Sequence, residues 1–179
     1  SVRGESEVLH ARAEILLSAR WPKEAKTSEL TVLGQPYTMS RDEIYQNVLF
    51  HGPDFHGIEE VIASARSGIS AKASVAPEPK AWIKDPMRSH WLGDPLAIDS
   101  AFQLMILWSV ENHEAPSLPC AVGRYRQYAR SFPKDGVELR IVVTGESSHH
   151  AKAKVEFLDS EGVVVARMDD YECVMDASL

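Results

Sequence analysis

Two polar side chains, Asp99 and Gln103, interrupt a strongly apolar stretch of the chain. In a helix, residues four apart lie on one face, one turn from each other, so both side chains would point to the same place. Apolar surroundings disfavour the charged form of a carboxyl group, which makes Asp99 a candidate for a protonated general acid. Gln103 would then orient it or bind a substrate oxygen. Spacing alone is equally consistent with a buried aspartate whose partners are backbone amides near the start of the helix.

The segment from His51 to His56 forms a second polar group, with two histidines, a carboxylate and the turn residues Gly52 and Pro53. This composition suggests a catalytic loop, a metal site or a structural turn. No third and fourth ligand recur at a spacing typical of metal sites, so we expect no metal. A structural turn is the commoner outcome for so short a motif.

The sequence holds no phosphate-binding glycine loop, no nucleophile elbow and no paired-cysteine metal spacing, which disfavours nucleotide and triad chemistry. Cys120 has no histidine or basic neighbour in the sequence, so we expect a small buried side chain rather than a nucleophile. We expect His90 to lie in a loop, and His149 with His150 to lie in an exposed turn.

The element that must carry the aspartate and the glutamine is a helix over residues 95–111. Asp94 can cap this helix, and Pro95 suits its first position because the N–H that proline lacks would be unpaired there. The stretch is apolar on almost every side. We therefore expect a buried helix at the centre of the fold.

A shorter helix should begin just after Ser40, where Ser40 and Glu43 form a capping box. Residues 58–75 predict a hairpin that turns at Ser67 and Gly68. Residues 80–91 are expected to be irregular, and an alternating pattern predicts an opening strand over residues 8–17. Four further strands should follow the central helix, at residues 119–131, 136–145, 149–158 and 163–175. The simplest architecture is α+β, an antiparallel sheet wrapped around a long central helix.

Composition narrows the function classes. The chain has 179 residues, with 26 Asp and Glu against 19 Lys and Arg, and this net charge of −7 argues against nucleic acid as a partner. The longest apolar stretch, residues 101–110, is about half of the roughly 20 residues that cross a bilayer, so we expect no membrane span. With no apolar signal core and two cysteines, we expect a cytoplasmic protein with reduced Cys120 and Cys173.

Three segments, in this order, resemble the dehydratase domain of polyketide synthases and polyunsaturated fatty acid synthases, specifically its C-terminal hotdog half. Residues 49–57 resemble the family's Gly-Pro-x-Phe turn. Residues 94–103 carry its Asp-x-x-x-Gln pattern on the long hotdog helix, and Leu118 with Pro119 begins the strands that follow. The likeness covers residues 37–175.

The resemblance implies one half of a double hotdog. Such an enzyme removes water from a 3-hydroxyacyl thioester, carried on the phosphopantetheine arm of an acyl carrier protein, and leaves a 2,3-unsaturated chain. In this family Asp99 would protonate the departing hydroxyl and Gln103 would orient it. No metal or nucleotide cofactor is implied. The active-site turn would consist of His51, Gly52, Pro53 and Phe55.

The family's base is a histidine of the N-terminal hotdog, in a His-x-x-x-Gly-x-x-x-x-Pro motif that this sequence lacks. We therefore expect residues 1–36 to hold the last strand of a preceding hotdog plus a linker. Residues 37–179 would form the C-terminal hotdog, so that the chain carries half of an active site. The chain also departs from the family at His51, where many relatives have a tyrosine.

A lone hotdog exposes an apolar flank, so we expect it to pair with the N-terminal hotdog half of the same synthase or with a second copy of itself. Because the chain is acidic, docking of an acidic carrier protein would need a local basic patch, for which Arg124, Arg126 and Arg130 are candidates. Two other functions stay open. One is a catalytically inactive, dehydratase-like domain that only binds the acyl chain, and the other is a product-template-type cyclase, against which Gln103 in place of asparagine argues modestly.

Overall fold

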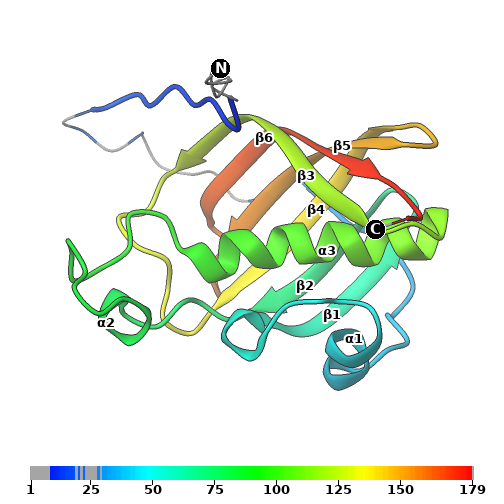
Figure 1. Cartoon of the computed structure of the whole chain (residues 1–179), viewed down its shortest axis with the longest axis horizontal. Helices are drawn as coiled ribbons and strands as arrows, with labels where there is room; N and C mark the ends of the chain where they lie inside the picture. The colour runs from blue at the N-terminus through cyan, green and yellow to red at the C-terminus, as the bar shows by residue number, and fades with distance from the viewer. Residues whose placement is uncertain (1–8, 19, 21, 23–27, 29, 179) are drawn as a thin grey trace, which may run out of the picture.

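An antiparallel sheet wraps around the long helix α3 (Pro95–His113), as Figure 1 shows. The computed structural model describes residues 9–18, 20, 22, 28 and 30–178. In these residues the sheet has six strands in the order β1-β2-β4-β5-β6-β3. Their bounds are β1 Ile58–Ala65, β2 Gly68–Ala73, β3 Ser117–Gln127, β4 Val137–Glu146, β5 His150–Leu158 and β6 Val164–Met175. This is the hotdog architecture that the sequence predicted.

Helix α3 begins where the sequence predicted, and its capping explains why. The Asp94 carboxylate accepts a hydrogen bond from the Ala97 amide at 2.9 Å, and Pro95 occupies the first helical position. The helix ends at Glu114, whose left-handed backbone (φ 55°) stops it two residues beyond the predicted end. Its middle turns are fully buried, and each buried leucine there contributes ~1.5–3 kcal/mol to stability. Helix α3 is therefore the fixed axis of the fold.

The predicted hairpin and the four later strands are confirmed. Strands β1 and β2 pair with Ala65 opposite Gly68. Gly68 has a φ of +154°, and a side chain there would collide with the Ile141 carbonyl on β4, so only glycine permits the close β2–β4 pairing. The helix after Ser40 is also confirmed, because α1 (Arg41–Asn47) starts with the expected capping box.

Two sequence-based expectations were wrong in detail. Residues 80–91 were expected to be irregular, but Pro79 starts a one-turn helix, α2 (Pro79–Trp82). The opening strand predicted at residues 8–17 does not form in residues 9–18, which are extended but exposed. A strand needs ladder partners, and the described residues of this segment pair with no strand, so alternation alone was not enough. Residues 1–8 lie outside the described part of the chain.

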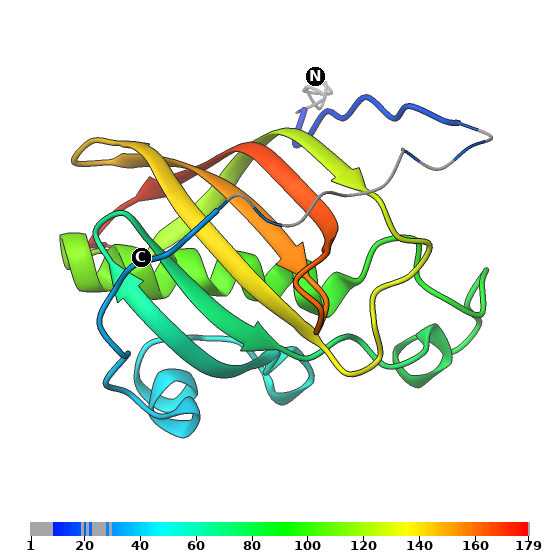
Figure 2. The ribbon, with the colours of Figure 1, turned by 180° about the vertical axis from the view of Figure 1, so that it is seen from behind.

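The stretch interpreted as a linker crosses the face of the sheet opposite α3, as the view from behind shows (Figure 2). The Leu30 carbonyl accepts a hydrogen bond from Arg140 at 3.2 Å, and Gln35 pairs with Ser64 through two backbone hydrogen bonds of 3.0 Å. Residues 23–27 of this stretch lie outside the described residues. In the part of the chain that the structure describes, no helix is long and apolar enough to cross a membrane.

We predict that replacing Asp94 with alanine lowers the free energy of unfolding by about 1–2 kcal/mol, because α3 loses its cap. The same carboxylate also accepts from the Ala76 amide, at 3.0 Å, so a second donor loses its partner. Urea unfolding measures the change. Asp94→Asn should be milder, since its amide oxygen can still cap, and Asp85→Ala is the exposed control. Equal stability of Asp94→Ala and the unchanged protein would contradict this account of α3.

Candidate active site

Helix α3 places Asp99 and Gln103 side by side, as their spacing predicted. The Gln103 Nε2 atom donates a hydrogen bond to Asp99 Oδ2 at 2.7 Å. Gln103 is fully buried, whereas the Asp99 side chain is 26% exposed and therefore open to a ligand. The structure thus excludes the alternative in which backbone amides satisfy a buried aspartate, because it is Gln103 that Asp99 contacts and the carboxyl group is not fully buried.

The orientation of the Gln103 amide is fixed by two further partners. Its Nε2 also donates to the Phe55 carbonyl at 2.7 Å, and its Oε1 accepts from the Tyr45 hydroxyl at 2.8 Å. The Tyr45 oxygen in turn accepts from the Ile58 amide at 2.8 Å. A backbone amide can only donate and a carbonyl can only accept, so the direction of every bond in this chain is determined. The result is a polarised path that ends on the Asp99 carboxyl group.

Tyr45 is a functional residue that the sequence did not reveal. It lies on α1, and its hydrogen-bond partner Gln103 is 58 positions away, so no local pattern links them. The predicted helix after Ser40 was the only signal that involved it. Burial raises the pKa of Tyr45 to about 12, so the hydroxyl keeps its proton and remains a donor across the physiological pH range.

Helix α1 also holds the predicted active-site turn in place. The Arg41 guanidinium donates to the carbonyls of His56 and Ile58, both at 3.0 Å. The His56 ring stacks on the Tyr45 ring at a centroid distance of 3.9 Å and donates from Nε2 to the His51 carbonyl at 2.9 Å. Six residues of turn are thereby tied to one helix.

Gly57 allows this turn to approach α3 closely. A side chain at Gly57 would overlap Ser100 and the side chain of Leu96, both on α3. Since the Phe55 carbonyl reaches Gln103 only at this approach, we expect the glycine to be required for the geometry of the site.

The turn brings His51 to the aspartate. Its Nε2 lies 3.5 Å from Asp99 Oδ2, and its side chain is 13% exposed. Phe50 stacks on the His51 ring at 4.5 Å. Burial lowers the pKa of His51, the charge of Asp99 opposes that shift, and His56 adds to it.

The other residues of the turn have different roles from one another. Gly52 and Pro53 precede and start the 3-10 turn η1 (Pro53–Phe55). The Phe55 ring stacks on Trp82 of α2 at 5.3 Å, so it is the Phe55 carbonyl that reaches Gln103. Among the described residues, no group of three or more His, Cys, Asp or Glu side chains is arranged to hold a metal ion.

The remaining candidates lie away from this centre. Cys120 was expected to be buried, but it is exposed, because it lies on β3 at the edge of the sheet. His90, His149 and His150 are exposed, at the loop and strand-start positions that were expected.

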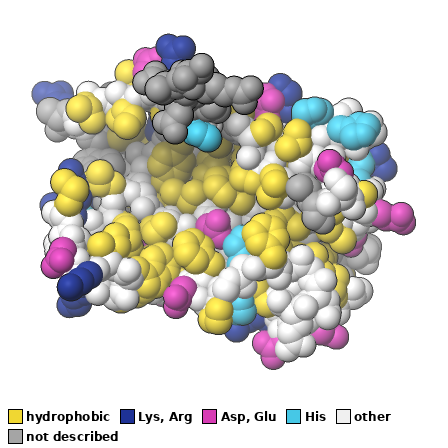
Figure 3. Space-filling model, in the orientation of Figure 1, with side chains coloured by type: hydrophobic (Ala, Val, Ile, Leu, Met, Phe, Trp, Pro, Cys, Tyr) yellow, Lys and Arg dark blue, Asp and Glu magenta, His cyan; other side chains and the backbone are white. Residues whose placement is uncertain are grey.

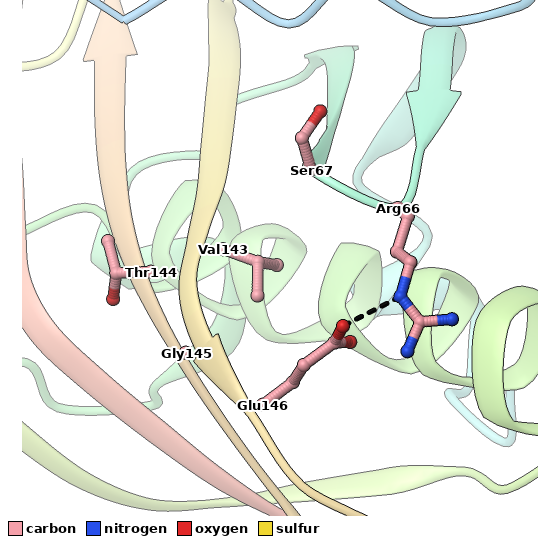
Figure 4. A pocket seen from close by; sticks show the side chains of 6 residues that line it. All are labelled: Arg66, Ser67, Val143, Thr144, Gly145 and Glu146. Atoms are coloured by element: carbon pink, nitrogen blue, oxygen red, sulfur yellow. Dashed lines mark hydrogen bonds and ion pairs between the residues drawn. The ribbon is translucent and has the colours of Figure 1, made fainter.

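Two hollow regions lie near α3. On the face that carries the helix, hydrophobic side chains gather in a hollow (Figure 3). A separate cavity of about 410 Å³ is lined by residues of the β1–β2 turn and β4, where Glu146 pairs with Arg66 at 2.7 Å (Figure 4). Glu146 also contacts His113 at the C-terminal end of α3, at 2.9 Å. That end is about 20 Å along the helix from Asp99, so the cavity of Figure 4 is not part of the site.

We predict that the pKa of His51, followed by its ring proton signals in an NMR titration, lies below the ordinary histidine value of 6.5. The imidazole is then neutral at pH 7 and gains its proton only as the pH falls below that value. Replacing Asp99 with asparagine should lower the pKa of His51 further, because the opposing negative charge is gone. A pKa that rises in this variant would contradict the geometry.

Sequence comparison finds a relative in Thraustochytrium sp., which is a component of a polyunsaturated fatty acid synthase. The two are 30% identical over 160 residues, which cover 84% of this chain and 5% of that protein. The chain is therefore similar to a small part of a much longer polypeptide.

Solved dehydratase domains share the fold. One, from a mycocerosic acid synthase-like polyketide synthase, is 20% identical with a TM-score of 0.65, covering 88% of this chain and 55% of that one. RzxB of Pseudomonas fluorescens is 15% identical with a TM-score of 0.64, covering 84% and 53%. PpsC of Mycobacterium tuberculosis, solved in complex with C12:1-CoA, is 18% identical with a TM-score of 0.61, covering 84% and 56%. The chain spans about half the length of these domains.

The family whose model matches is described as the polyketide synthase dehydratase N-terminal domain, and the match covers residues 22–175. These residues include all of α1, the turn and α3, and with them the whole hydrogen-bond path from Ile58 to Asp99. The chain belongs to the polyketide synthase dehydratase family.

Proposed function

We propose that this chain is one hotdog of a dehydratase that removes water from a 3-hydroxyacyl thioester on an acyl carrier protein and leaves a 2,3-enoyl product. The observation that carries the proposal is the partly exposed Asp99 carboxyl group, held by a buried Gln103 on α3. A fixed carboxyl group at an opening is suited to deliver a proton to a bound hydroxyl group.

The reaction needs two proton transfers. A base takes the proton at carbon 2, the electron pair forms the carbon–carbon double bond, and the bond from carbon 3 to the hydroxyl oxygen breaks. Asp99 gives its proton to that oxygen, which leaves as water. A base, an acid and a positioned carbonyl are sufficient for this elimination, so no metal or nucleotide cofactor enters the proposal. The C12:1-CoA of the PpsC complex is an acyl thioester, which fits a substrate of this class.

The base, in this proposal, is a histidine of a second hotdog. The chain spans about half of the solved dehydratase domains, which leaves room for such a half. The matching family is described as an N-terminal domain, whereas the Asp-x-x-x-Gln pattern at Asp99 and Gln103 resembles the C-terminal half. We assign this chain to the C-terminal half because the aspartate and its glutamine are both present.

Strand β3 is the surface we assign to the second hotdog. It ends the sheet, so one row of its backbone groups has no strand partner among the described residues. Leu118, Val122 and Tyr125 on this strand are each 37–39% exposed. An edge strand with apolar side chains is a template for pairing. The partner would be the N-terminal hotdog of the same synthase, or a second copy of this chain.

A basic group near the same edge suits an acidic carrier protein. Arg124 and Arg126 lie two apart on β3, and Arg130 follows the strand; all three are exposed. Residues two apart on a strand point to the same face, so the first two charges act together. This local patch provides the attraction that the overall charge of −7 does not.

We predict that Asp99→Asn abolishes loss of water from a 3-hydroxyacyl thioester, measured by mass spectrometry on the synthase polypeptide with both hotdogs present. Asparagine keeps the shape of the side chain but has no acidic proton. Asp54→Asn, in the same turn region but outside the hydrogen-bond path, is the control. Turnover by Asp99→Asn would remove Asp99 from the role of acid. No turnover by the unchanged protein would favour a noncatalytic acyl-binding domain or a cyclase.

We predict that Arg124→Glu combined with Arg126→Glu raises the KM for a carrier-bound substrate several-fold and leaves the KM for a small-molecule thioester unchanged. The reversal turns attraction into repulsion at the docking surface, and salt should shrink the difference. Lys154→Glu, an exposed charge reversal on β5, is the matched control. An equal rise with both substrates would mean that the two arginines do not bind the carrier protein.

A further inference from the structure

His51 has no part in the elimination described above, yet its ring lies against the proposed acid. Its Nε2 atom is 3.5 Å from Asp99 Oδ2, and its Nδ1 atom is buried with no hydrogen-bond partner in the described part of the chain. The side chain faces Asp99 because the turn that carries it is tied to α1 through Arg41 and His56. A histidine held so firmly beside an acid must affect that acid.

The geometry determines which ring nitrogen carries the proton. Asp99 Oδ2 already accepts a hydrogen bond from Gln103, so it presents lone pairs to its neighbours. A ring nitrogen that faced it with a lone pair of its own would be repelled, so Nε2 carries the hydrogen and Nδ1 does not. The lowered pKa of His51 agrees with a neutral ring in this tautomer.

Two N–H groups therefore converge on one carboxyl oxygen. Gln103 reaches Oδ2 from the next turn of α3, at 2.7 Å, and His51 reaches it from the turn, at 3.5 Å. The His51 contact is longer than a hydrogen bond, and such contacts in an unliganded site commonly tighten when substrate binds. In a protonated carboxyl group the oxygen that accepts hydrogen bonds is the carbonyl oxygen, and the other oxygen carries the proton.

We infer that His51 is a positioning residue for the acid: together with Gln103 it holds Oδ2 of Asp99 as an acceptor, so that Oδ1 carries the proton and delivers it to the leaving hydroxyl. This inference rests on the proposed dehydration. His51 acts only through Asp99, and the proton that moves is the one on Oδ1.

The inference makes one side-chain atom decisive, which a pair of amide substitutions can test. Glutamine at position 51 places an N–H group near the position of Nε2, whereas asparagine places its amide near Nδ1. His51→Gln should keep kcat within a few-fold of the unchanged protein. His51→Asn and His51→Phe should lower kcat about 10- to 100-fold with little change in KM, because the substrate still binds but the acid is misaligned.

The experiment uses the synthase polypeptide with both hotdogs, a 3-hydroxyacyl thioester as substrate, and thermal unfolding to check that each variant folds. His149→Phe, at an exposed strand start, is the control. Equal kcat for His51→Gln and His51→Asn, whether both high or both low, would overturn the inference, since a merely structural residue does not distinguish the two nitrogen positions. Asp99→Asn in the same series separates the two proposals: activity in that variant overturns the acid itself, whereas its inactivity leaves only the role of His51 at issue.

Discussion

The hydrogen bond from Gln103 to Asp99 depends on a polarised path whose direction is set by the backbone. The Ile58 amide can only donate, so the Tyr45 hydroxyl donates onward to the Gln103 oxygen, and the Gln103 nitrogen is left to face Asp99 and the Phe55 carbonyl. Each partner is buried or part-buried, where an unpaired polar group costs about 1–3 kcal/mol. The network therefore resists rearrangement, and the one carboxyl group at its end stays in place.

The path has to be assembled from three separate elements, and the fold serves that need. Helix α3 is buried in the sheet and cannot shift without disrupting the core. Helix α1 contributes Tyr45 and, through Arg41, holds the turn that follows it. Gly57 lets the turn lie against α3 without a side chain between them. A rigid support of this kind keeps a proton donor within the narrow range of geometry that proton transfer requires.

Sequence reasoning predicted the parts of this arrangement that have local signals. Asp94 and Pro95 marked the start of α3, and the four-residue spacing placed Asp99 next to Gln103. Tyr45 left no such signal, because its role arises only when α1 packs against α3. The opening strand failed for the same reason: its alternation is local, but a strand exists only with a partner. Cys120 was expected to be buried because the sequence does not show which strand ends the sheet.

The central claim is that Asp99 delivers a proton through Oδ1 while Gln103 holds Oδ2. The most direct measurement is a crystal structure of the two-hotdog protein with a 3-hydroxyacyl analogue that cannot eliminate water. The account predicts the 3-hydroxyl oxygen within hydrogen-bond distance of Asp99 Oδ1, about 2.5–3.0 Å, with the Gln103 contact to Oδ2 retained. A hydroxyl group bound by another side chain, or by the oxygen that Gln103 contacts, would contradict it.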